Sequence, residues 1–290
     1  MSGALAAGDT FPDYRVRARN LFRDSANRIH DDAVARTYGY AGGLVAGTTV
    51  YAYLTHPLVA RWGLDWLGRG TVTVRFRRPV YEGDEVSVRA RVAGRSGGAV
   101  AGEVAVELEA HTPREGMVAA AVAGLAWGGP PVVPDPRGWP EAPLPAVRRP
   151  ATPAAVAALD PLGAPALALD EAELARYADG VDDALGVYRG PGAVAHPGLL
   201  LQQANRALAE NVALGPWVHV GSDVAHCGLA RRGDRIATRG RVARVFEKKG
   251  RRLAELDLVV VADGDRPVAH VRHTAIYDLG DPGAAGPTRG

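Results

Sequence analysis

The chain lacks most of the features that mark secreted and membrane-spanning proteins. It has one cysteine, Cys227, so it cannot form an intramolecular disulfide, which suits a reducing compartment. Its first ten residues contain no basic stretch followed by an apolar core, as a secretory signal would. Its longest apolar stretches, such as 44–54, are too short and too interrupted to cross a bilayer. These absences predict a cytoplasmic protein with no membrane partner.

Aromatic residues are also few, at 6% of the chain, and the formal net charge is only +2. Nucleic-acid binding calls for a concentrated basic stripe and accessible aromatic side chains, so no nucleic-acid partner is expected. The spacing of Cys, His and carboxylate residues fits no metal-ligand pattern, so no metal is expected. What the chain does have is 47% hydrophobic residues over 290 positions, which is typical of a globular protein of two domains.

Proline is concentrated in one segment, where nine prolines fall between residues 130 and 153. Such a run cannot supply the amide donors of a strand and favours extended, semi-rigid backbone. The expected division is therefore an N-terminal unit (1–128), a linker (129–165), a C-terminal unit (166–280) and a flexible tail (281–290).

The two units resemble each other at a fixed offset of 150 residues. Gly83-Asp84 matches Gly233-Asp234, and the segments 89–93 and 239–243 share four identities. The alternation of apolar residues at 104–108 also keeps the phase of that at 254–258. These matches indicate a duplicated unit, and the alternative is a chance resemblance between two similar hairpins.

Each unit has the same predicted order of elements. Long helices are predicted at 45–62 and 197–211, where apolar residues follow helical spacing. Residues 31–37 are expected to form a short helical turn. In the first unit, alternating strands are predicted at 14–21, 70–76, 84–92 together with the partner strands that follow it to residue 109, and 117–127. In the second unit they are predicted at 218–225, 234–246, 251–262 and 268–277. One long helix followed by an antiparallel meander predicts an α+β unit. Two units then give two antiparallel sheets, each wrapping a long central helix, related by a pseudo-twofold axis.

The segment from Asp24 to Gly47 carries the candidate chemistry. His30 stands just before a glycine-punctuated loop that opens the long helix. The first amides of a helix have no intrahelical partners and lie at the positive end of its dipole, and Gly47 lets a ligand approach that backbone. This helix end could polarise a carbonyl that gains enolate character, while an imidazole titrating near neutrality moves the proton.

This segment resembles the MaoC-like, or R-specific enoyl-thioester hydratase, family in its double-hotdog form. The family motif Asp-x-Asn-Pro-x-His is matched at Asn27 and His30, and Gly47 stands at the glycine of the helix-opening His-Gly pair. The segment 75–84, Arg-Phe-Arg-Arg-Pro-Val-Tyr-Glu-Gly-Asp, resembles the family's Phe-x-x-Pro-Val-x-x-Gly-Asp. The resemblance covers most of 14–127 and, more weakly, about 174–279.

The resemblance implies a double hotdog fold and a hydro-lyase that acts on an enoyl or 3-hydroxyacyl thioester of coenzyme A or a carrier protein. His30 would then be the general acid and base, and Asn27 would orient water or its neighbour. The Gly47 amide, next to Ala46, would bind the thioester oxygen. No cofactor is implied beyond the coenzyme A or phosphopantetheine of the substrate. An acyl carrier protein and a second copy of the chain are left open as partners.

The sequence departs from the family motif at three positions. Ser25 stands at the catalytic aspartate, Arg28 at the proline, and Ala46 at the histidine before the helix glycine. Asp24 and Asp31 are therefore candidates to supply a carboxylate from a shifted register.

The second unit is expected to be degenerate, because at the offset of 150 His30 aligns with Gly180 and Gly47 with Pro197. A purely structural role is the alternative for parts of the motif. His30 could cap the following turn, and carboxylates such as Asp31 and Asp32 are favoured at a helix N-terminus for capping alone.

Further residues are assigned to the wall and mouth of the pocket. The wall residues are Tyr38, Tyr40, Val50, His219 and His226. Arg231 and Arg232, in a basic hairpin, are assigned to phosphate binding, because arginine suits phosphate oxygens; a solvated strand face is the alternative.

The segment 217–226 contains Ser222 and Asp223 beside two histidines, which would suit a hydrolase triad. Strand alternation, however, predicts that His219 and Asp223 share one face while Ser222 lies on the other with His226. A triad is therefore not expected.

Two other functions remain open on this scaffold. A hotdog thioesterase typically needs a carboxylate on the central helix, and its opening turns at 48–54 contain none. A non-hydratase, either a specialised lyase or cyclase or a non-catalytic acyl-binding protein, is favoured by Ser25 in place of the aspartate.

Overall fold

Ten strands form one continuous antiparallel sheet in the computed structural model, which describes residues 5–96, 103–125 and 128–282. Their order across the sheet is β1-β3-β4-β5-β2-β9-β12-β11-β10-β7. The strands are β1 (Tyr14–Arg17), β2 (Gly70–Phe76), β3 (Glu85–Ser96), β4 (Glu103–Thr112), β5 (Gly116–Leu125), β7 (Ala166–Ala168), β9 (Val218–His226), β10 (Arg235–Lys248), β11 (Arg251–Ala262) and β12 (Arg266–Asp278).

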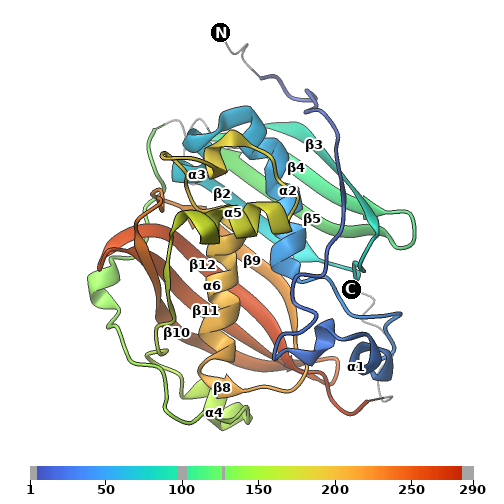
Figure 1. Ribbon diagram of the computed structural model, residues 1–290, viewed down its shortest axis with the longest axis vertical. Coiled ribbons are helices and arrows are strands. Elements are labelled where there is room, and N and C mark those ends of the chain that lie inside the picture. Colours follow the sequence, from blue (N-terminus) through green and yellow to red (C-terminus); the bar gives the residue numbers. More distant parts are fainter. Residues whose placement is uncertain (1–4, 97–102, 126–127, 283–290) are drawn as a thin grey trace.

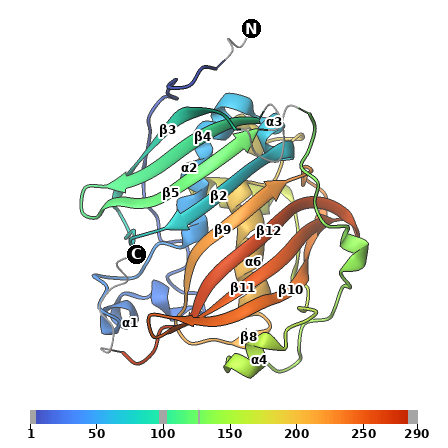
Figure 2. The ribbon, with the colours of Figure 1, turned by 180° about the vertical axis from the view of Figure 1, so that it is seen from behind.

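Two long helices, α2 (Gly47–Trp62) and α6 (Pro197–Ala209), pack against each other on one face of this sheet (Figure 1). Seen from behind, the strands cover both helices (Figure 2). Residues 48–55 of α2 are all buried, on every side of the helix. A helix buried all round needs apolar or hydrogen-bonded side chains on all its faces, because no side meets water. The sheet and α6 together therefore enclose α2.

The remaining elements are short and connect the sheet to the helices. They are η1 (Arg28–His30), α1 (Asp32–Thr37), α3 (Leu64–Arg69), η2 (Pro136–Gly138), β6 (Arg149–Pro150), α4 (Pro153–Ala157), α5 (Glu171–Gly180), η3 (Gly186–Tyr188) and β8 (Val212–Ala213). The proline-rich segment follows the outside of the second half (Figure 2). Its Trp139 packs against Ala237, Val259 and Val261, and β6 pairs in parallel with β8.

The hydrogen-bond registers of the two halves repeat at the offset of 150. Val88 pairs with Ala110 as Thr238 pairs with Val260, and the bulge after Val92 recurs after Val242. The two halves join where β2 pairs with β9, and there Thr73 faces Asp223, its own counterpart. This self-pairing places the pseudo-twofold axis between those two strands.

Four details of the predicted architecture were wrong. The two expected sheets form a single sheet. The edge strands β2 and β9 pair across the axis, so that the backbone amides and carbonyls of each edge are hydrogen-bonded to the other. The strand predicted at 14–21 ends at Arg17, and the helix predicted to reach 211 ends at Ala209. The long helix predicted at 45–62 begins two residues later, at Gly47.

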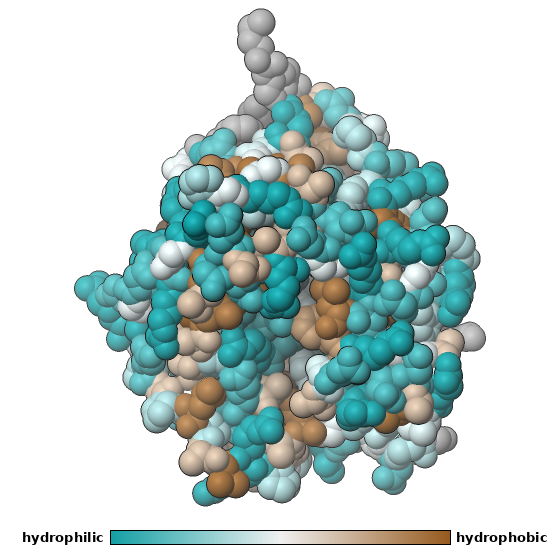
Figure 3. Space-filling view, in the orientation of Figure 1, coloured by the Kyte–Doolittle hydropathy of each residue, from teal (hydrophilic) through white to brown (hydrophobic). Residues whose placement is uncertain are grey.

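The face that carries the helices is largely hydrophilic, with separate small hydrophobic spots (Figure 3). In the described part of the chain, no helix has the length and apolar character needed to cross a membrane.

Candidate active site

A cavity of about 610 Å³ opens where the start of α2 meets the second half of the sheet. Both halves of the chain contribute to its wall, which is mainly apolar. The apolar lining residues include Ile29, Leu44, Val45, Val50, Phe76, Val80, Trp217, Val218, Leu253 and Ile276. The polar side chains that are not cationic are few: Asn27, His30, Tyr40, Asn205 and His219. An apolar cavity with a few convergent polar groups is the usual form of a small-molecule site.

His30 lies on the cavity wall with its two ring nitrogens in different environments. Nδ1 is 2.6 Å from the Leu44 carbonyl oxygen, which can only accept a hydrogen bond, so Nδ1 carries the hydrogen. Nε2 therefore has a lone pair and is 3.4 Å from Asn27 Nδ2. Burial lowers the pKa of His30 below its ordinary value, and the bond to Leu44 offsets this only in part. His30 is thus a neutral base at neutral pH.

Asn27 connects His30 to the second half of the chain. Its side chain caps η1 by accepting from the Ile29 amide at 3.3 Å. The same amide group donates to the Trp217 carbonyl at 3.0 Å and accepts from the Trp217 amide at 3.1 Å. Because the Asn27 side chain is hydrogen-bonded to Trp217 through both its oxygen and its nitrogen and also contacts His30, it fixes the position of His30 relative to β9.

The loop between α1 and α2 holds the His30 backbone in place. Asn20 donates to the His30 carbonyl at 2.8 Å, and Asp32 accepts from the Gly43 amide at 2.7 Å. A side chain at Gly43 would collide with the His30 carbonyl. The absence of a side chain at Gly43 therefore allows this loop to pack directly against the backbone of His30.

The start of α2 forms part of the cavity wall. Ala46 is the N-cap residue, makes no side-chain cap, and lines the cavity together with Gly47. The first amides of a helix lack intrahelical acceptors and carry the positive end of its dipole. This end of α2 can therefore receive the oxygen of a polarised carbonyl.

The candidate carboxylates lie elsewhere. Asp24 is exposed. Asp31 caps α1 by accepting from the Val34 amide at 2.9 Å and pairs with Arg28 at 3.0 Å. The bond from Val34 lowers the pKa of Asp31. Ser25 is 3.4 Å from the Asn27 carbonyl oxygen and does not line the cavity. Among the residues described, no Asp or Glu lines this cavity, so the capping interpretation of Asp31 is the one that the contacts support.

Strand alternation was wrong about His219. A β-bulge at Val220 shifts the register between β9 and β12, so that His219 turns to the same face as Ser222. His219 Nε2 is 2.8 Å from Ser222 Oγ, which is 3.0 Å from His273 Nδ1. Asp223 points the other way and pairs with Arg75 at 2.9 Å. Gly221 was the available signal, because a glycine inside a strand pattern often marks a bulge.

The other assigned wall residues divide between the cavity and the core. Tyr40 and Val50 line the cavity, whereas Tyr38 does not. His226 is fully buried between helix and sheet, 3.4 Å from the Tyr51 hydroxyl and edge-on to Trp66.

Cations gather at the mouth of the cavity, although not the two that were assigned. Arg231 and Arg232 are absent from the lining, and Arg232 pairs with Glu171 on α5. The cationic lining residues are Arg77, Arg78, Lys248, Lys249 and Arg251. The two lysines are the only ones in the chain and lie at the tip of the β10–β11 hairpin. The β10–β11 hairpin thus lines the cavity with the lysines at its tip, and not with Arg231 and Arg232, which precede β10.

The loop of the second half does not follow the offset of 150. The Leu44 amide bonds the Ile29 carbonyl, and its counterpart, the Val194 amide, bonds the Val187 carbonyl. Ile29 therefore corresponds to Val187 at an offset of 158, and His30 to Tyr188 rather than to Gly180. The shift arises because the first half has its short helix α1 after η1, whereas the second half has α5 before η3.

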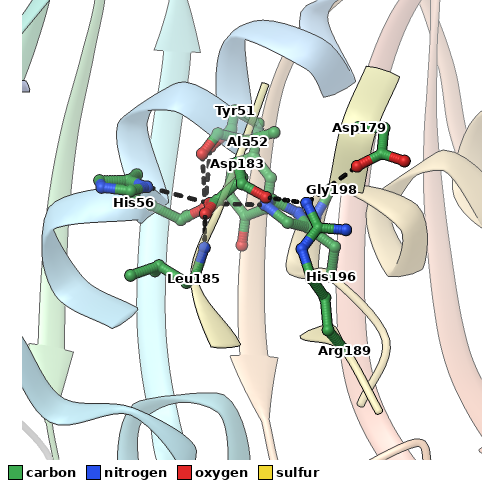
Figure 4. A network of polar contacts seen from close by, with 10 residues as sticks. Tyr51, Ala52, His56, Asp179, Asp183, Leu185, Arg189, His196 and Gly198 are labelled. Atoms are coloured by element: carbon green, nitrogen blue, oxygen red, sulfur yellow. Dashed lines mark hydrogen bonds and ion pairs between the residues drawn. The ribbon is translucent and has the colours of Figure 1, made fainter. Parts of the chain in front are cut away.

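With this correction, the second half has an aspartate and a histidine at two of the three positions where the first half departs from the motif. Asp183 corresponds to Ser25, and His196, the N-cap of α6, corresponds to Ala46. Asp183 lies between His56 at 3.0 Å and His196 at 3.3 Å (Figure 4). Burial alone would raise the pKa of Asp183, but the hydrogen bonds to the two histidines hold it well below its usual range.

The second site is nevertheless closed. Tyr177 on α5 occupies the space that a side chain on Gly198 would need, at the start of α6. Tyr177 and Tyr188 both pack on the His196 ring, with centroid separations of 5.3 Å and 4.5 Å. Since these side chains are all buried, aromatic packing fills the place that corresponds to the open cavity of the first half.

Comparison with known proteins gives matches in structure only. No family model matches the sequence, and no curated protein matches it. A structure from Chloroflexus aurantiacus, described as a MaoC domain protein dehydratase, has 14% identity and a TM-score of 0.64, and the match covers 95% of this chain and 97% of that one.

Two further structures are similar over nearly their whole length. A hypothetical protein of Mycobacterium tuberculosis, described as having a double hotdog fold, has 16% identity and a TM-score of 0.61, with 94% and 96% covered. A structure from Lactobacillus plantarum, described as that of an assigned oleoyl thioesterase, has 10% identity and a TM-score of 0.52, with 94% and 98% covered. Dehydratases and thioesterases thus share this architecture with the chain. The chain has the double hotdog fold.

Proposed function

We propose that this protein adds water to a trans-2-enoyl thioester, or removes it from a 3-hydroxyacyl thioester. The observation that carries the proposal is the neutral His30, whose Nε2 lone pair lies on the wall of an apolar cavity beside the start of α2. A base and a carbonyl-binding helix end are the two groups that this reaction needs.

The reaction is proton transfer and water addition only. His30 Nε2 takes a proton from water as the water oxygen bonds to C3 of the enoyl group. The electrons of the double bond move to the thioester carbonyl, whose oxygen accepts hydrogen bonds from the first amides of α2. The proton on His30 then goes to C2, so that one water is added and the histidine is neutral again.

The missing carboxylate makes His30 carry both proton transfers. Since no acidic side chain of the described residues lines the cavity, the histidine has no carboxylate partner there that would stabilise its cation. Its lowered pKa fits this arrangement, because a neutral imidazole is the form that accepts a proton from water. Asn27 orients the ring, and its 3.4 Å contact with Nε2 is long enough to give way to water.

The cationic mouth supports a phosphorylated carrier, either coenzyme A or the phosphopantetheine of a carrier protein. Arginine and lysine side chains bind phosphate oxygens through charge-assisted hydrogen bonds. We expect Lys248→Glu combined with Lys249→Glu to raise KM for an enoyl-CoA more than tenfold and to leave kcat nearly unchanged. Arg231→Glu is the matched control, because Arg231 does not line the cavity and should leave KM as it is.

The central test is hydration of a short trans-2-enoyl-CoA by wild type and by His30→Ala. General acid–base catalysis contributes about 100- to 10,000-fold, so His30→Ala should lose that much rate with little change in melting temperature. His111→Ala serves as a control, since His111 lies on β4 paired with Glu109, away from the cavity. Equal rates in wild type and His30→Ala would overturn the proposal.

The product distinguishes the alternatives on this fold. Release of free coenzyme A would identify a thioesterase, which the first turn of α2 disfavours because it has no acidic residue. Binding of an acyl thioester without turnover would identify an acyl-binding protein, which is favoured because no Asp or Glu is among the described residues that line the cavity.

A further inference from the structure

A buried histidine from the second half of the chain lies against the start of α2. His219 is 5% exposed and lines the cavity. Its Nδ1 is 2.9 Å from the position that a Cβ on Gly47 would occupy. The corresponding position in the second half is His196, which caps α6, whereas the N-cap of α2 is Ala46. An imidazole reaches the start of α2 from β9 instead.

The Nδ1 atom of His219 has no hydrogen-bond partner among the described residues, although it is buried. The opposite nitrogen, Nε2, contacts Ser222 Oγ at 2.8 Å, and Ser222 Oγ contacts His273 Nδ1 at 3.0 Å. The two imidazole rings are 4.1 Å apart, and His273 is fully buried. A histidine with one nitrogen held and the other unpartnered is arranged to bind something in the cavity.

The hydrogen positions along this chain follow from what each atom can do. The Ser222 hydroxyl has one hydrogen, so it donates to one histidine and accepts from the other. His273 Nε2 also has no partner within the described chain. Only one of the two unpartnered nitrogens, Nδ1 of His219 and Nε2 of His273, then carries a hydrogen. His219 lines the cavity, where a bound ligand can accept from Nδ1, whereas His273 is fully buried and is not among the lining residues. Because a buried N–H without an acceptor is rare, Nε2 of His273 is the bare atom and its Nδ1 carries the hydrogen. His273 then donates to Ser222, and Ser222 donates to Nε2 of His219. His219 therefore has its hydrogen on Nδ1, at the cavity.

We propose that His219, oriented by Ser222 and His273, donates its Nδ1 hydrogen to the carbonyl oxygen of a thioester bound at the start of α2. This inference rests on the proposed function and adds a carbonyl-binding residue to it. The imidazole and the first amides of α2 then hold the same oxygen from two sides. The negative charge that the oxygen gains is stabilised without any proton leaving the histidine.

The surroundings keep His219 neutral. Burial and the neighbouring His273 lower the pKa of His219 well below its ordinary value, and burial lowers the pKa of His273 to about 3. A neutral imidazole still donates one strong hydrogen bond, and in a water-excluded site such a preoriented donor stabilises developing charge effectively.

The tautomer can be measured without any substrate. In a long-range ¹⁵N–¹H spectrum of the ¹⁵N-labelled protein, a protonated ring nitrogen is distinguished from a bare one by its chemical shift. We expect the hydrogen on Nδ1 in both His219 and His273, with the signals assigned through His219→Gln and His273→Gln. A hydrogen on Nε2 of His219 would overturn the proposal, whatever the enzyme does.

The effect on the carbonyl is tested with a trans-2-hexenoyl-CoA carrying ¹³C at the thioester carbon, bound to the His30→Ala protein so that it does not react. Its infrared carbonyl stretch should move to lower frequency on binding, and His219→Leu in the same background should remove most of that shift. His219→Gln keeps a donor and should retain part of it. His226→Gln is the matched control, because His226 is equally buried on β9 but does not line the cavity.

Kinetics supply the last readout. Loss of one such donor typically costs about 100- to 1,000-fold in kcat, so His219→Leu should lower kcat by that factor with little effect on KM. An unchanged carbonyl stretch and kcat in His219→Leu would overturn the role of His219 while leaving the proposed function intact. If the protein with His219 intact does not bind the enoyl-CoA, the proposed function fails and the role of His219 fails with it.

Discussion

The two nitrogens of His30 separate positioning from chemistry. The bond from Nδ1 to the Leu44 carbonyl is short, at 2.6 Å, and fixes the tautomer. The contact of Nε2 with Asn27 is long, at 3.4 Å, and faces the cavity. Because Leu44 holds Nδ1 firmly, Nε2 can exchange its weak contact with Asn27 for a water molecule while the imidazole ring stays in place.

The pH dependence of hydration follows from this environment. Because burial lowers the pKa of His30 below its ordinary 6.5, the base takes up its proton below pH 6.5. We expect kcat/KM to be nearly level between pH 7 and 8 and to fall at lower pH, with an acid inflection below 6.5. A pH–rate profile with its acid inflection above 6.5 would contradict the assignment of His30 as the base. The residual rate of His30→Ala should show no such inflection.

At the scale of single elements, the start of α2 depends on the absence of a side chain at Gly47. A Cβ there would lie 2.9 Å from His219 Nδ1 and 3.1 Å from Phe76 Cε2. We expect Gly47→Ala to lower the free energy of unfolding by about 1–3 kcal/mol, as overpacking usually does, and to impair hydration. Chemical denaturation and the hydration assay measure the two effects.

Gly68 provides the matched control on α3. A Cβ there would meet only Leu229, at an ordinary contact distance of 3.7 Å. Since alanine favours helix over glycine by about 1 kcal/mol, Gly68→Ala should leave activity unchanged and stabilise the protein slightly. Equal losses in the two variants would show that the defect of Gly47→Ala does not arise from the site.

Helix α5 closes the second site, and Tyr177 is the residue that does it. Its hydroxyl has no hydrogen-bond partner among the described residues, although the side chain is fully buried. We expect Tyr177→Phe to change the free energy of unfolding by less than about 1 kcal/mol, because it removes only an unpaired polar atom. Tyr177→Ala should cost about 3–5 kcal/mol, since it leaves a cavity beside His196.

Urea denaturation of both Tyr177 variants checks this expectation. A loss of more than about 2 kcal/mol in Tyr177→Phe would mean that the hydroxyl does bind a partner, such as a buried water. A Tyr177→Ala protein as stable as wild type would contradict the close packing of α5 at the second site.

At the scale of the whole molecule, the interior contains several histidines that are uncharged in the folded state. Burial lowers the pKa of His226 to about 4 and that of His273 to about 3. The unfolded chain binds protons on these groups below pH 6.5, whereas the folded chain does not. Stability is therefore complete above pH 6.5 and is lost as the pH falls toward 4.

Each such histidine changes the free energy of unfolding by about 1.4 kcal/mol per pH unit in that range. We expect the free energy of unfolding to fall between pH 6 and 4, and His226→Leu to reduce the slope by about that amount. Denaturation of both proteins at several pH values measures it. A His226→Leu curve parallel to that of wild type would contradict the neutral burial of His226.

Local patterns were enough to predict part of the fold and of the site. The start of each long helix, predicted to within two residues, and the loop that presents Asn27, His30 and Gly47 depend on residues close together in the chain. The offset of 150 was visible as well, because each half repeats such a local pattern. Spacing along the backbone determines such features, because helical turns, caps and strand alternation are set by immediate neighbours.

Long-range pairing decided the rest. The bulge that turns His219 toward Ser222 exists only in the pairing of β9 with β12, and the edges of two expected sheets became one sheet through β2 and β9. The correspondence of His30 with Tyr188 depends on two hydrogen bonds within the loops, from Leu44 to Ile29 and from Val194 to Val187, which an ungapped alignment at the offset of 150 does not reveal. The sequence by itself determined the duplicated double-hotdog plan and one catalytic candidate. Only the tertiary structure decided which half keeps an open cavity and which side chains meet in it, because those contacts join residues far apart in the chain.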